Sequence, residues 1–366
     1  MIKARPTIEN LIPYQSARRI GHVGSVWLNA NEAGSSPDFL SAELRAQLLH
    51  RYPNAQPENL LQAYANYANQ HGAALTAQNV LATRGADEGI ELLIRCYCEP
   101  YQDAIIHCTP TYGMYAISAQ TADVAVIDVP LLADSRALNE AELLAQLPKA
   151  KLLFLCSPNN PTGDLLSRAV LLRLLKAAAN TTLVVVDEAY IEFCPQESVI
   201  DLLASYPNLV ITRTLSKAFG LAGIRCGFVL AHAQIIEQLK KVIAPYPIPT
   251  PVSAVAELAV SATNVPLMTR NVANVNQAKN DLVSLLRSLS FVTEIFPAHG
   301  NFMLVRFKDS ATVFQAMLAQ GVVLRDFSTK PSLSHCIRLS IGTKTEMDAV
   351  TQVLASIENA EHQPEN

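Results

Sequence analysis

Short apolar runs, each followed by a polar or glycine-bearing loop and then by a helical stretch, repeat through the middle of the chain. Runs of this kind, bounded by turn residues, are typical of buried strands, and strands that alternate with helices form mainly parallel sheets. The pattern therefore predicts an α/β domain in which ligands bind at the carboxyl ends of the strands. The predicted strands are Val80–Thr83, Ala104–Cys108, Leu152–Cys156, Leu183–Val186, Leu209–Thr212 and Gly227–Leu230.

The pattern changes within the segment Pro245–Pro251, where four prolines mark a break. A long helical stretch, interrupted near Pro266, follows and runs to about Ser288. Two further strands are expected at Phe302–Phe307 and Cys336–Ser340, with helices beside them. We therefore predict three parts, which are an N-terminal arm that packs with a small domain (1–45), a large domain (46–250), and an interdomain helix with the C-terminal small domain (251–366).

Composition narrows the function classes. Half of the 366 residues are apolar, 16% are charged, and the formal net charge of -4 comes from charges of both signs along the chain, so no nucleic-acid or polybasic membrane surface is expected. The start lacks the apolar segment of a signal peptide, and the apolar runs are shorter than the ~20 residues of a membrane span. Seven cysteines without a CxxC pair predict reduced thiols, no metal site and a cytoplasmic location.

Lys217 lies after the predicted strand 209–212, in the segment TLSKAFGLAGIRCGF. A lysine by itself would be interpreted as a surface residue. Thr214 and Ser216 supply hydroxyls beside it, however, and Arg225 follows between glycines, which suits a phosphate. Lysine forms imines with aldehydes, and its nucleophilicity rises when burial or nearby cations lower its pKa. The segment therefore favours a covalent imine next to a phosphate site.

Asp187 follows four β-prone apolar residues, where a carboxylate is costly to bury unless it is paired. It could cap a helix, or it could be the counter-ion of a buried cation such as a protonated pyridine nitrogen. Tyr190, three residues later, and Asn160, in the loop after strand 152–156, could each donate a hydrogen bond to a phenolate oxygen. The loop SPNNPTG alone could also be an ordinary Asn-Pro turn.

Two more strand ends carry candidate residues. Gly85 permits a close turn, after which the backbone N–H groups of Ala86 and Asp87 would begin a helix and bind an anion, unless the helix is simply capped. Tyr112 could stack on a flat heterocycle or fill the core. The order along the chain is anion loop, aromatic, asparagine, aspartate–tyrosine, lysine and arginine, and all lie at predicted strand ends, which predicts one site.

These motifs resemble the fold-type I pyridoxal-phosphate (PLP) aminotransferases, and more narrowly the histidinol-phosphate aminotransferase subgroup. The resemblance covers nearly the whole chain and implies a large domain with a mainly parallel central sheet plus a smaller α/β domain. One local departure is HGNFM at 299–303, where relatives have a bulkier residue at Gly300. The motifs that carry the resemblance are PYQSARR (13–19), VWLNANE (26–32), RYP (51–53), RGADEGIELLIR (84–95), PTYGMY (110–115), CSPNNPTG, DEAYIEFCP, RTLSKAFGLAGIRCGF, KVIAPYP, VVLRDF (322–327) and CIRLSIGT (336–343).

The resemblance implies a role for each residue. Lys217 would form the Schiff base with PLP and then move a proton. Asp187 would pair with the pyridinium nitrogen, Asn160 and Tyr190 would bond the phenolic oxygen, and Tyr112 would stack on the ring. The remaining cofactor residues would hold the phosphate, and they are Ala86, Asp87, Thr214, Ser216 and Arg225.

The resemblance also implies the substrates and the assembly. Arg338 would bind the carboxylate of glutamate, and Arg325 and Tyr14 would bind the substrate phosphate with help from Arg338. Tyr52 would reach the cofactor phosphate of the neighbouring subunit, which implies a homodimer with shared sites. The implied reaction is ping-pong transfer between L-histidinol phosphate and 2-oxoglutarate, giving imidazole-acetol phosphate and L-glutamate, in L-histidine biosynthesis.

Three alternatives remain open at this point. A PLP lyase acting on a phosphorylated amino acid, such as threonine-phosphate decarboxylase, would share nearly every cofactor residue. An aromatic-amino-acid aminotransferase would have less reason to carry Arg325. A non-catalytic PLP-binding regulator usually carries a DNA-binding region, and no basic helix-turn-helix segment precedes residue 20.

Overall fold

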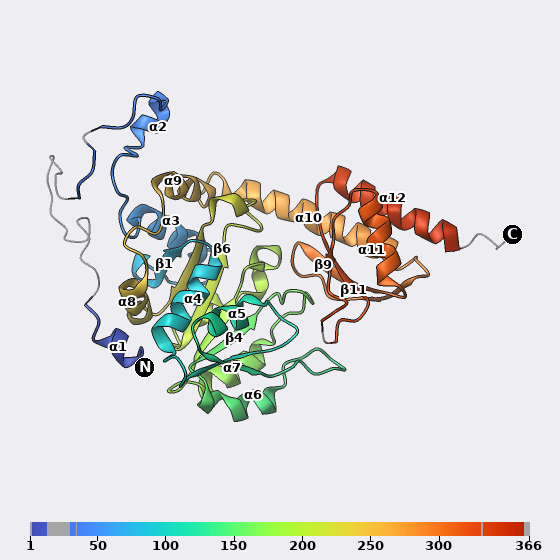
Figure 1. Cartoon of the computed structure of the whole chain (residues 1–366), viewed down its shortest axis with the longest axis horizontal. Helices are drawn as coiled ribbons and strands as arrows, with labels where there is room; N and C mark the ends of the chain where they lie inside the picture. The colour runs from blue at the N-terminus through green and yellow to red at the C-terminus, as the bar shows by residue number, and fades with distance from the viewer. Residues whose placement is uncertain (1, 13–29, 34, 331, 362–366) are drawn as a thin grey trace.

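The computed structural model describes residues 2–12, 30–33, 35–330 and 332–361. Two β-sheets with their helices form a larger and a smaller body (Figure 1). The long helix α10, Val265–Leu286, begins at the larger body and runs along the smaller one, with Pro266 in its first turn. The predicted interruption near Pro266 is confirmed, because the preceding helix ends at Ala259 and α10 begins at Val265, where proline costs no backbone hydrogen bond.

The sheet of the larger body has seven strands in the order β1-β7-β6-β5-β4-β2-β3. Its strands are parallel except β7, which is antiparallel to both of its neighbours. The prediction of a mainly parallel sheet is confirmed, and six strands begin where the apolar runs predicted them. The strands are β1 Val80–Thr83, β2 Ala104–His107, β3 Ala125–Asp128, β4 Leu152–Cys156, β5 Leu183–Asp187, β6 Leu209–Thr214 and β7 Gly227–Ala231.

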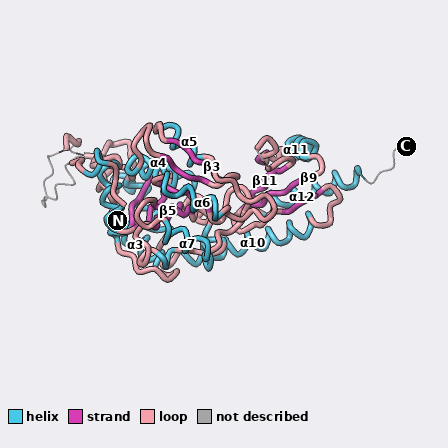
Figure 2. Tube along the Cα trace, turned by 90° about the horizontal axis from the view of Figure 1, so that it is seen from below, coloured by secondary structure: helices cyan, strands magenta, loops and turns pink. Residues whose placement is uncertain are grey.

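Helices cover both faces of this sheet, and Figure 2 shows the strands enclosed between them. Because both faces are buried, successive residues of β5 enter different apolar clusters, with Val184 and Val186 on one side and Val185 on the other. The clusters include residues of α3, α7 and α9 on the first face and of α4, α5 and α8 on the second. The helices are α3 Glu58–Asn69, α4 Ala86–Tyr97, α5 Met114–Thr121, α6 Glu140–Gln146, α7 Arg168–Ala177, α8 Ala233–Val242 and α9 Thr250–Ala259.

The sheet of the smaller body is antiparallel, with four strands in the order β10-β11-β9-β8. Strands β9 and β11 were predicted, whereas β8 was missed because its residues are half-exposed and β10 because it has two residues. One face of this sheet packs on α10, α11 and α12. The elements are β8 Val292–Ile295, β9 Phe302–Phe307, β10 Arg325–Asp326, β11 Cys336–Ser340, α11 Ser310–Ala319 and α12 Lys344–Glu361.

Residues 2–12 contain the short helix α1, Pro6–Glu9, which packs against α8. The backbone N–H of Arg5 donates to the carbonyl of Cys96 at 3.0 Å, and Ala4 and Ile8 join the apolar cluster over α4 and α8. The prediction that the N-terminal segment packs with the small domain is therefore wrong for residues 2–12. The domain boundaries themselves stay predictions.

The described residues also contain a short α-helix and several 3-10 helices. The α-helix, α2 Ala42–Ala46, has Ser41 as its N-cap. Short 3-10 helices lie at Ala77–Asn79, Leu147–Lys149, Ile191–Phe193, Pro195–Glu197, Ile200–Leu202 and Ala222–Ile224. All seven cysteines are free, and among the described residues none of the helices has the length and apolarity to cross a membrane.

Candidate active site

Asp187 is the last residue of β5 and is buried at the carboxyl end of the larger sheet. Its carboxylate accepts hydrogen bonds from the hydroxyls of Tyr115 (2.7 Å) and Thr212 (3.0 Å) and from the backbone N–H of Ala189 (3.2 Å). Burial raises the pKa of Asp187, and these three donors oppose that shift. No α-helix follows for it to cap, because the next element is a 3-10 helix with Tyr190 as N-cap. The environment suits a carboxylate paired with a buried cation.

Two of these donors, Thr212 and Tyr115, were not predicted from the sequence. Thr212 lies directly opposite Asp187 in the parallel register of β5 and β6, and Tyr115 reaches it from α5. Tyr115 is fully buried, with a hydroxyl inside an apolar cluster. Thr212 is a polar residue at the end of a predicted apolar strand, and that position could have marked it as a site residue. The register that brings it to Asp187 was not visible in the chain.

Lys217 follows β6 and keeps solvent access. Its Nζ lies 5.5 Å from the centroid of the Tyr190 ring. Partial burial and the neighbouring Arg338 guanidinium lower the pKa of Lys217, so that more of the amine is neutral than in free lysine. The charges of Asp87, Asp187 and Arg225 also bear on the pKa of this amine.

Asn160 connects the two bodies at this site. Its Nδ2 donates to the hydroxyl of Tyr190 at 3.3 Å, and its Oδ1 accepts from Nη1 of Arg338 in β11. Burial lowers the pKa of Arg338. Among the described residues, Nε of Arg338 is a buried donor without a hydrogen-bond partner. A ligand anion could accept from it.

The N-terminus of α4 is the predicted anion site. Gly85 is its N-cap at a φ of 80°, a conformation that side chains disfavour. The N–H groups of Ala86 and Asp87 lie in the first turn, where a helix offers them no acceptor. Arg225 reaches this turn, with Nη2 3.6 Å from a carboxylate oxygen of Asp87. The backbone of Gly227 lies so close that a Cβ there would be 2.6 Å from the Ala86 nitrogen.

The predicted phosphate ligands form one connected group next to this turn. The hydroxyl of Thr214 donates to Ser216 Oγ at 2.9 Å, and Arg225 Nη1 donates to the same oxygen at 3.5 Å. The hydroxyl of Tyr112 donates to Asp87 at 2.9 Å, and its ring meets Tyr115 edge-on at a centroid distance of 5.6 Å. Hydroxyls, a guanidinium and helix N–H groups are together suited to a phosphate.

Three predicted residues lie outside this group. Arg325 is exposed opposite Arg338 in the β10–β11 register, and the two line a cavity of about 560 Å³. Tyr52 is half-exposed and stacks on Tyr246 at 4.4 Å between ring centroids. Tyr14 lies outside the described residues.

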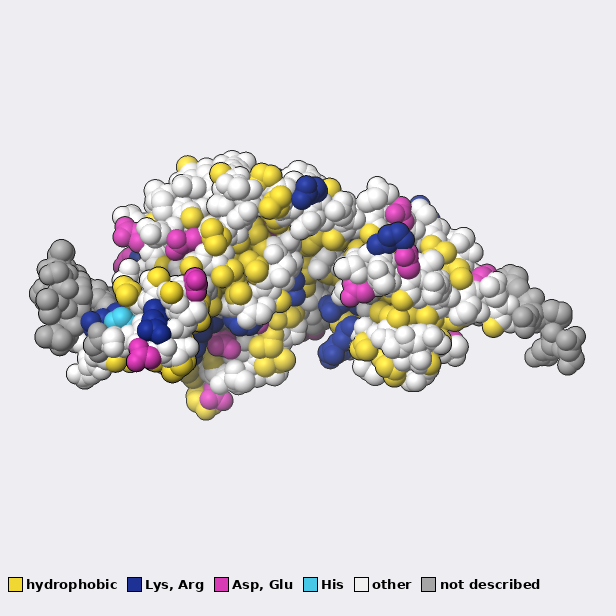
Figure 3. Space-filling view, turned by 90° about the horizontal axis from the view of Figure 1, so that it is seen from above, with side chains coloured by type: hydrophobic (Ala, Val, Ile, Leu, Met, Phe, Trp, Pro, Cys, Tyr) yellow, Lys and Arg dark blue, Asp and Glu magenta, His cyan; other side chains and the backbone are white. Residues whose placement is uncertain are grey.

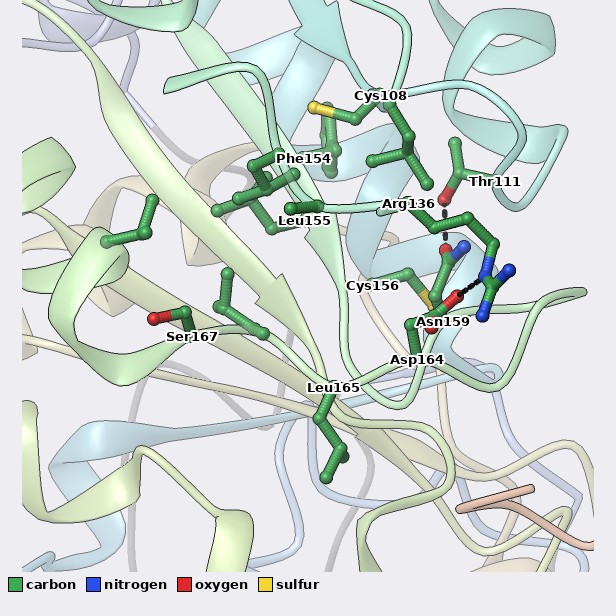
Figure 4. A pocket seen from close by; sticks show the side chains of 15 residues that line it. Cys108, Thr111, Arg136, Phe154, Leu155, Cys156, Asn159, Asp164, Leu165 and Ser167 are labelled. Atoms are coloured by element: carbon green, nitrogen blue, oxygen red, sulfur yellow. Dashed lines mark hydrogen bonds and ion pairs between the residues drawn. The ribbon is translucent and has the colours of Figure 1, made fainter. Parts of the chain in front are cut away.

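The surface at the site carries basic side chains, whereas the interior next to it is mostly apolar. Figure 3 shows Lys and Arg side chains gathered at the hollow between the two bodies, which favours anionic ligands. Behind the loop that carries Asn160 lies a mostly apolar cavity of about 100 Å³ (Figure 4). Thr111, Asn159, Arg136 and Asp164 are among the residues that line it. The hydroxyl of Thr111 donates to Asn159 at 2.8 Å, which braces the loop.

The chain is similar to known aminotransferases over nearly its whole length. The family model "Aminotransferase class I and II" matches residues 23–354. The chain is 53% identical over 351 residues to the histidinol-phosphate aminotransferase of Aeromonas salmonicida, covering 96% of each chain. The crystal structure of the histidinol-phosphate aminotransferase from Clostridium acetobutylicum has a TM-score of 0.77 at 23% identity and covers 86% of this chain and 92% of that one. The enzyme of that name from Sinorhizobium meliloti, in complex with pyridoxal-5'-phosphate, has a TM-score of 0.74 at 23% identity, with 90% of each chain covered.

Proposed function

Since the chain belongs to the class I and II aminotransferase family, we propose that it is a PLP-dependent enzyme that moves an amino group between L-histidinol phosphate and 2-oxoglutarate. The products are imidazole-acetol phosphate and L-glutamate, and the reaction belongs to L-histidine biosynthesis in the cytoplasm. The observation that carries this proposal is the 53% identity to a histidinol-phosphate aminotransferase over 96% of both chains.

The residues at the strand ends fit PLP. Asp187 is a buried carboxylate of the kind that pairs with a protonated ring nitrogen. The first turn of α4 and Arg225 provide donors for the cofactor phosphate, and the backbone of Gly227 leaves room for no side chain there. Lys217 has the lowered pKa that covalent attachment of an aldehyde needs.

When bound, PLP supplies an electron sink that stabilises the negative charge left on a carbon after a proton leaves it. The proton itself has to be carried by the protein. Lys217 Nζ would take and return it, because its lowered pKa keeps part of the amine neutral. Tyr190 and Asn160, linked by their 3.3 Å hydrogen bond, would orient the cofactor by bonding its phenolic oxygen. Asp187 would hold the ring nitrogen protonated.

One site has to accept two amino donors in turn. Arg338 would bind the carboxylate of glutamate, since its planar fork suits a carboxylate and its Nε is free of protein acceptors among the described residues. The phosphate of histidinol phosphate carries more negative charge than a carboxylate. Arg325, opposite Arg338 in the strand register, would supply the second cation, and Tyr14 would bind the same phosphate. Two arginines at one end of the site therefore support a phosphorylated donor.

The proposed assembly is a homodimer in which Tyr52 reaches the neighbouring cofactor. Tyr52 is 50% exposed, and apolar side chains of the N-terminal region are exposed with it, among them Phe39 at 85% and Leu48 at 58%. In the proposed dimer, the partner subunit would cover these side chains.

The absorbance spectrum of the PLP-loaded enzyme tests the cofactor and the amino donor together. Histidinol phosphate should change the cofactor band, and 2-oxoglutarate should restore it while glutamate appears. Lys217→Ala should abolish turnover, whereas Lys176→Ala, an exposed lysine on α7, should not. Near-normal turnover by Lys217→Ala would contradict the mechanism, and release of carbon dioxide without need of an oxo-acid would show a lyase instead.

A further inference from the structure

Gly300 lies against two aromatic rings of the candidate site, those of Phe302 and Tyr190. A Cβ at Gly300 would be 2.8 Å from Cε1 of Phe302 and 3.4 Å from Cδ1 of Tyr190. Its φ lies outside the left-handed region, so the backbone conformation does not require glycine. The available space does require glycine, because a side chain at position 300 has to displace the ring of Phe302.

Phe302 touches both a cofactor residue and a substrate residue. Its ring meets the ring of Tyr190 edge-on, at a centroid distance of 5.0 Å and an angle of 75°. The guanidinium carbon of Arg338 lies 5.4 Å from the Phe302 centroid and also 5.4 Å from that of Phe327. The strand register explains this contact, because Arg338 lies opposite Leu304 and Phe302 is its diagonal neighbour on the same face.

The backbone at Gly300 is held in place from α10. Lys279 is a buried lysine whose ammonium donates to the Gly300 carbonyl at 2.9 Å and to Asn276 Oδ1 at 2.9 Å. Asn276 in turn donates to the carbonyl of Phe193, three residues after Tyr190, at 3.2 Å. Because this chain ties Gly300 to the segment that carries Tyr190, the backbone cannot easily move away from an added side chain, and the Phe302 ring has to yield.

We propose that Phe302, in the space that Gly300 leaves free, is a positioning residue that orients the Arg338 guanidinium for the anionic group of either amino donor. An arginine binds a carboxylate or phosphate in two parallel hydrogen bonds only when its plane is correctly turned. Asn160 holds one end of that plane through Nη1, and the Phe302 face fixes its tilt. This role rests on the proposed function, since it assumes that Arg338 meets the substrate.

The test is the binding of glutarate to the PLP-loaded enzyme by titration calorimetry. Glutarate has the two carboxylates of glutamate without the amino group, so it reports anion binding without turnover. Phe302→Leu and Gly300→Ala should each weaken glutarate binding by about two- to thirtyfold, the range expected for a lost cation–π contact. In the half-reactions with glutamate and with histidinol phosphate, the loss should appear in KM more than in kcat.

Matched controls separate positioning from stability. Phe307→Leu removes an equally buried ring from the far end of β9, where it packs on Phe291 instead of the site. Gly113→Ala adds a methyl group where nothing lies within 4 Å. Both variants should bind glutarate with a dissociation constant within about twofold of the wild-type value.

The outcomes are distinct. If the two site variants bind glutarate like wild type while their melting temperatures fall as in Phe307→Leu, the role is only structural and the proposal is wrong. If Phe302→Leu does not fold, Gly300→Ala decides alone, because it removes no buried atom. A wild-type enzyme that binds glutarate but does not convert histidinol phosphate would overturn the proposed function and leave standing only the part of this inference that concerns carboxylate binding at Arg338.

Discussion

At the scale of single residues, the properties of the site come from the neighbours of each group. Asp187 is a strand-end carboxylate like Asp128 on β3, yet Asp128 is exposed and Asp187 is buried with three donors. Burial raises the pKa of Asp187, and a buried cation would reverse that shift. The same side chain can therefore be an ordinary surface acid or the partner of a protonated ring nitrogen.

Asp187→Asn should keep the shape of the site and remove the negative charge that holds the cofactor nitrogen protonated. We expect the rate of the chemical step to fall at least about a hundredfold, which is roughly 3 kcal/mol of barrier. Single-turnover kinetics with histidinol phosphate measure this step. Asp128→Asn is the control at an exposed strand end. Unchanged kinetics in Asp187→Asn would contradict the proposed role of Asp187 as the partner of the ring nitrogen.

Arg325→Gln should affect the two donors differently. The substitution removes a charge next to Arg338 but keeps a side chain that can donate hydrogen bonds. A charge-assisted bond to a phosphate is worth about 1.5–3 kcal/mol, so the histidinol-phosphate half-reaction should lose roughly ten- to a hundredfold in kcat/KM. The glutamate half-reaction should lose much less. Stopped-flow measurement of each half-reaction makes the comparison, and equal losses would mean that Arg325 does not recognise the phosphate.

At the scale of elements, the anion site depends on how closely β7 approaches the start of α4. Gly227 begins β7, opposite Thr83 of β1 and Thr214 of β6. A Cβ there would meet the Ala86 nitrogen and the Gly85 carbonyl carbon at 2.6 Å. Because both are backbone atoms of the helix start, they cannot rotate away as a side chain could.

Gly227→Ala should therefore displace the first turn of α4. Inserting a methyl group into a packed site costs about 1–3 kcal/mol, and we expect a loss of that size in the free energy of unfolding together with weaker PLP binding. Denaturant unfolding and a PLP titration measure the two effects. Gly223→Ala, which meets nothing within 4 Å, should change neither stability nor cofactor affinity by a comparable amount. Wild-type PLP affinity in Gly227→Ala would show that the close approach does not shape the cofactor site.

At the scale of the whole molecule, the site is assembled from both bodies. Arg338 of the smaller sheet donates to Asn160 of the larger body. Arg136 of the larger body donates to Glu294 on β8 at 2.8 Å and lies 4.8 Å from the Phe296 ring centroid. These contacts set the distance between the proposed cofactor residues of one body and the proposed substrate arginines of the other. The proposed homodimer would add a third contribution, from Tyr52.

A mixed dimer tests whether Tyr52 serves the neighbouring subunit. One chain carries Tyr52→Phe and the other carries Lys217→Ala, so the single intact lysine faces a partner with a native Tyr52. If the proposal is right, PLP affinity at that site should stay near wild type. An affinity as low as that of the Tyr52→Phe homodimer would show that the tyrosine acts within its own chain.

The sequence by itself determined six of the seven strands of the larger sheet, the order of the motifs and the family, whereas β3, Ala125–Asp128, was not predicted. Apolar runs such as Leu183–Val186 predict buried strands because burial on both faces selects apolar residues locally. Polar residues after those runs, from Asp187 to Lys217, predict a site because parallel strands end at one edge of the sheet. These inferences need only neighbours in the chain.

Only the tertiary structure decided which distant side chains meet. Tyr115 reaches Asp187 from 72 residues away, and Arg338 reaches Asn160 from 178 residues away. Residues 2–12 pack on α4 and α8, because Ala4 and Ile8 find an apolar surface there that no local pattern reveals. The position of the Phe302 ring in the space beside Gly300 is likewise a contact that only the tertiary structure decides. Strand register and helix packing set such contacts, and they arise from the burial of the whole chain rather than from any one segment of it.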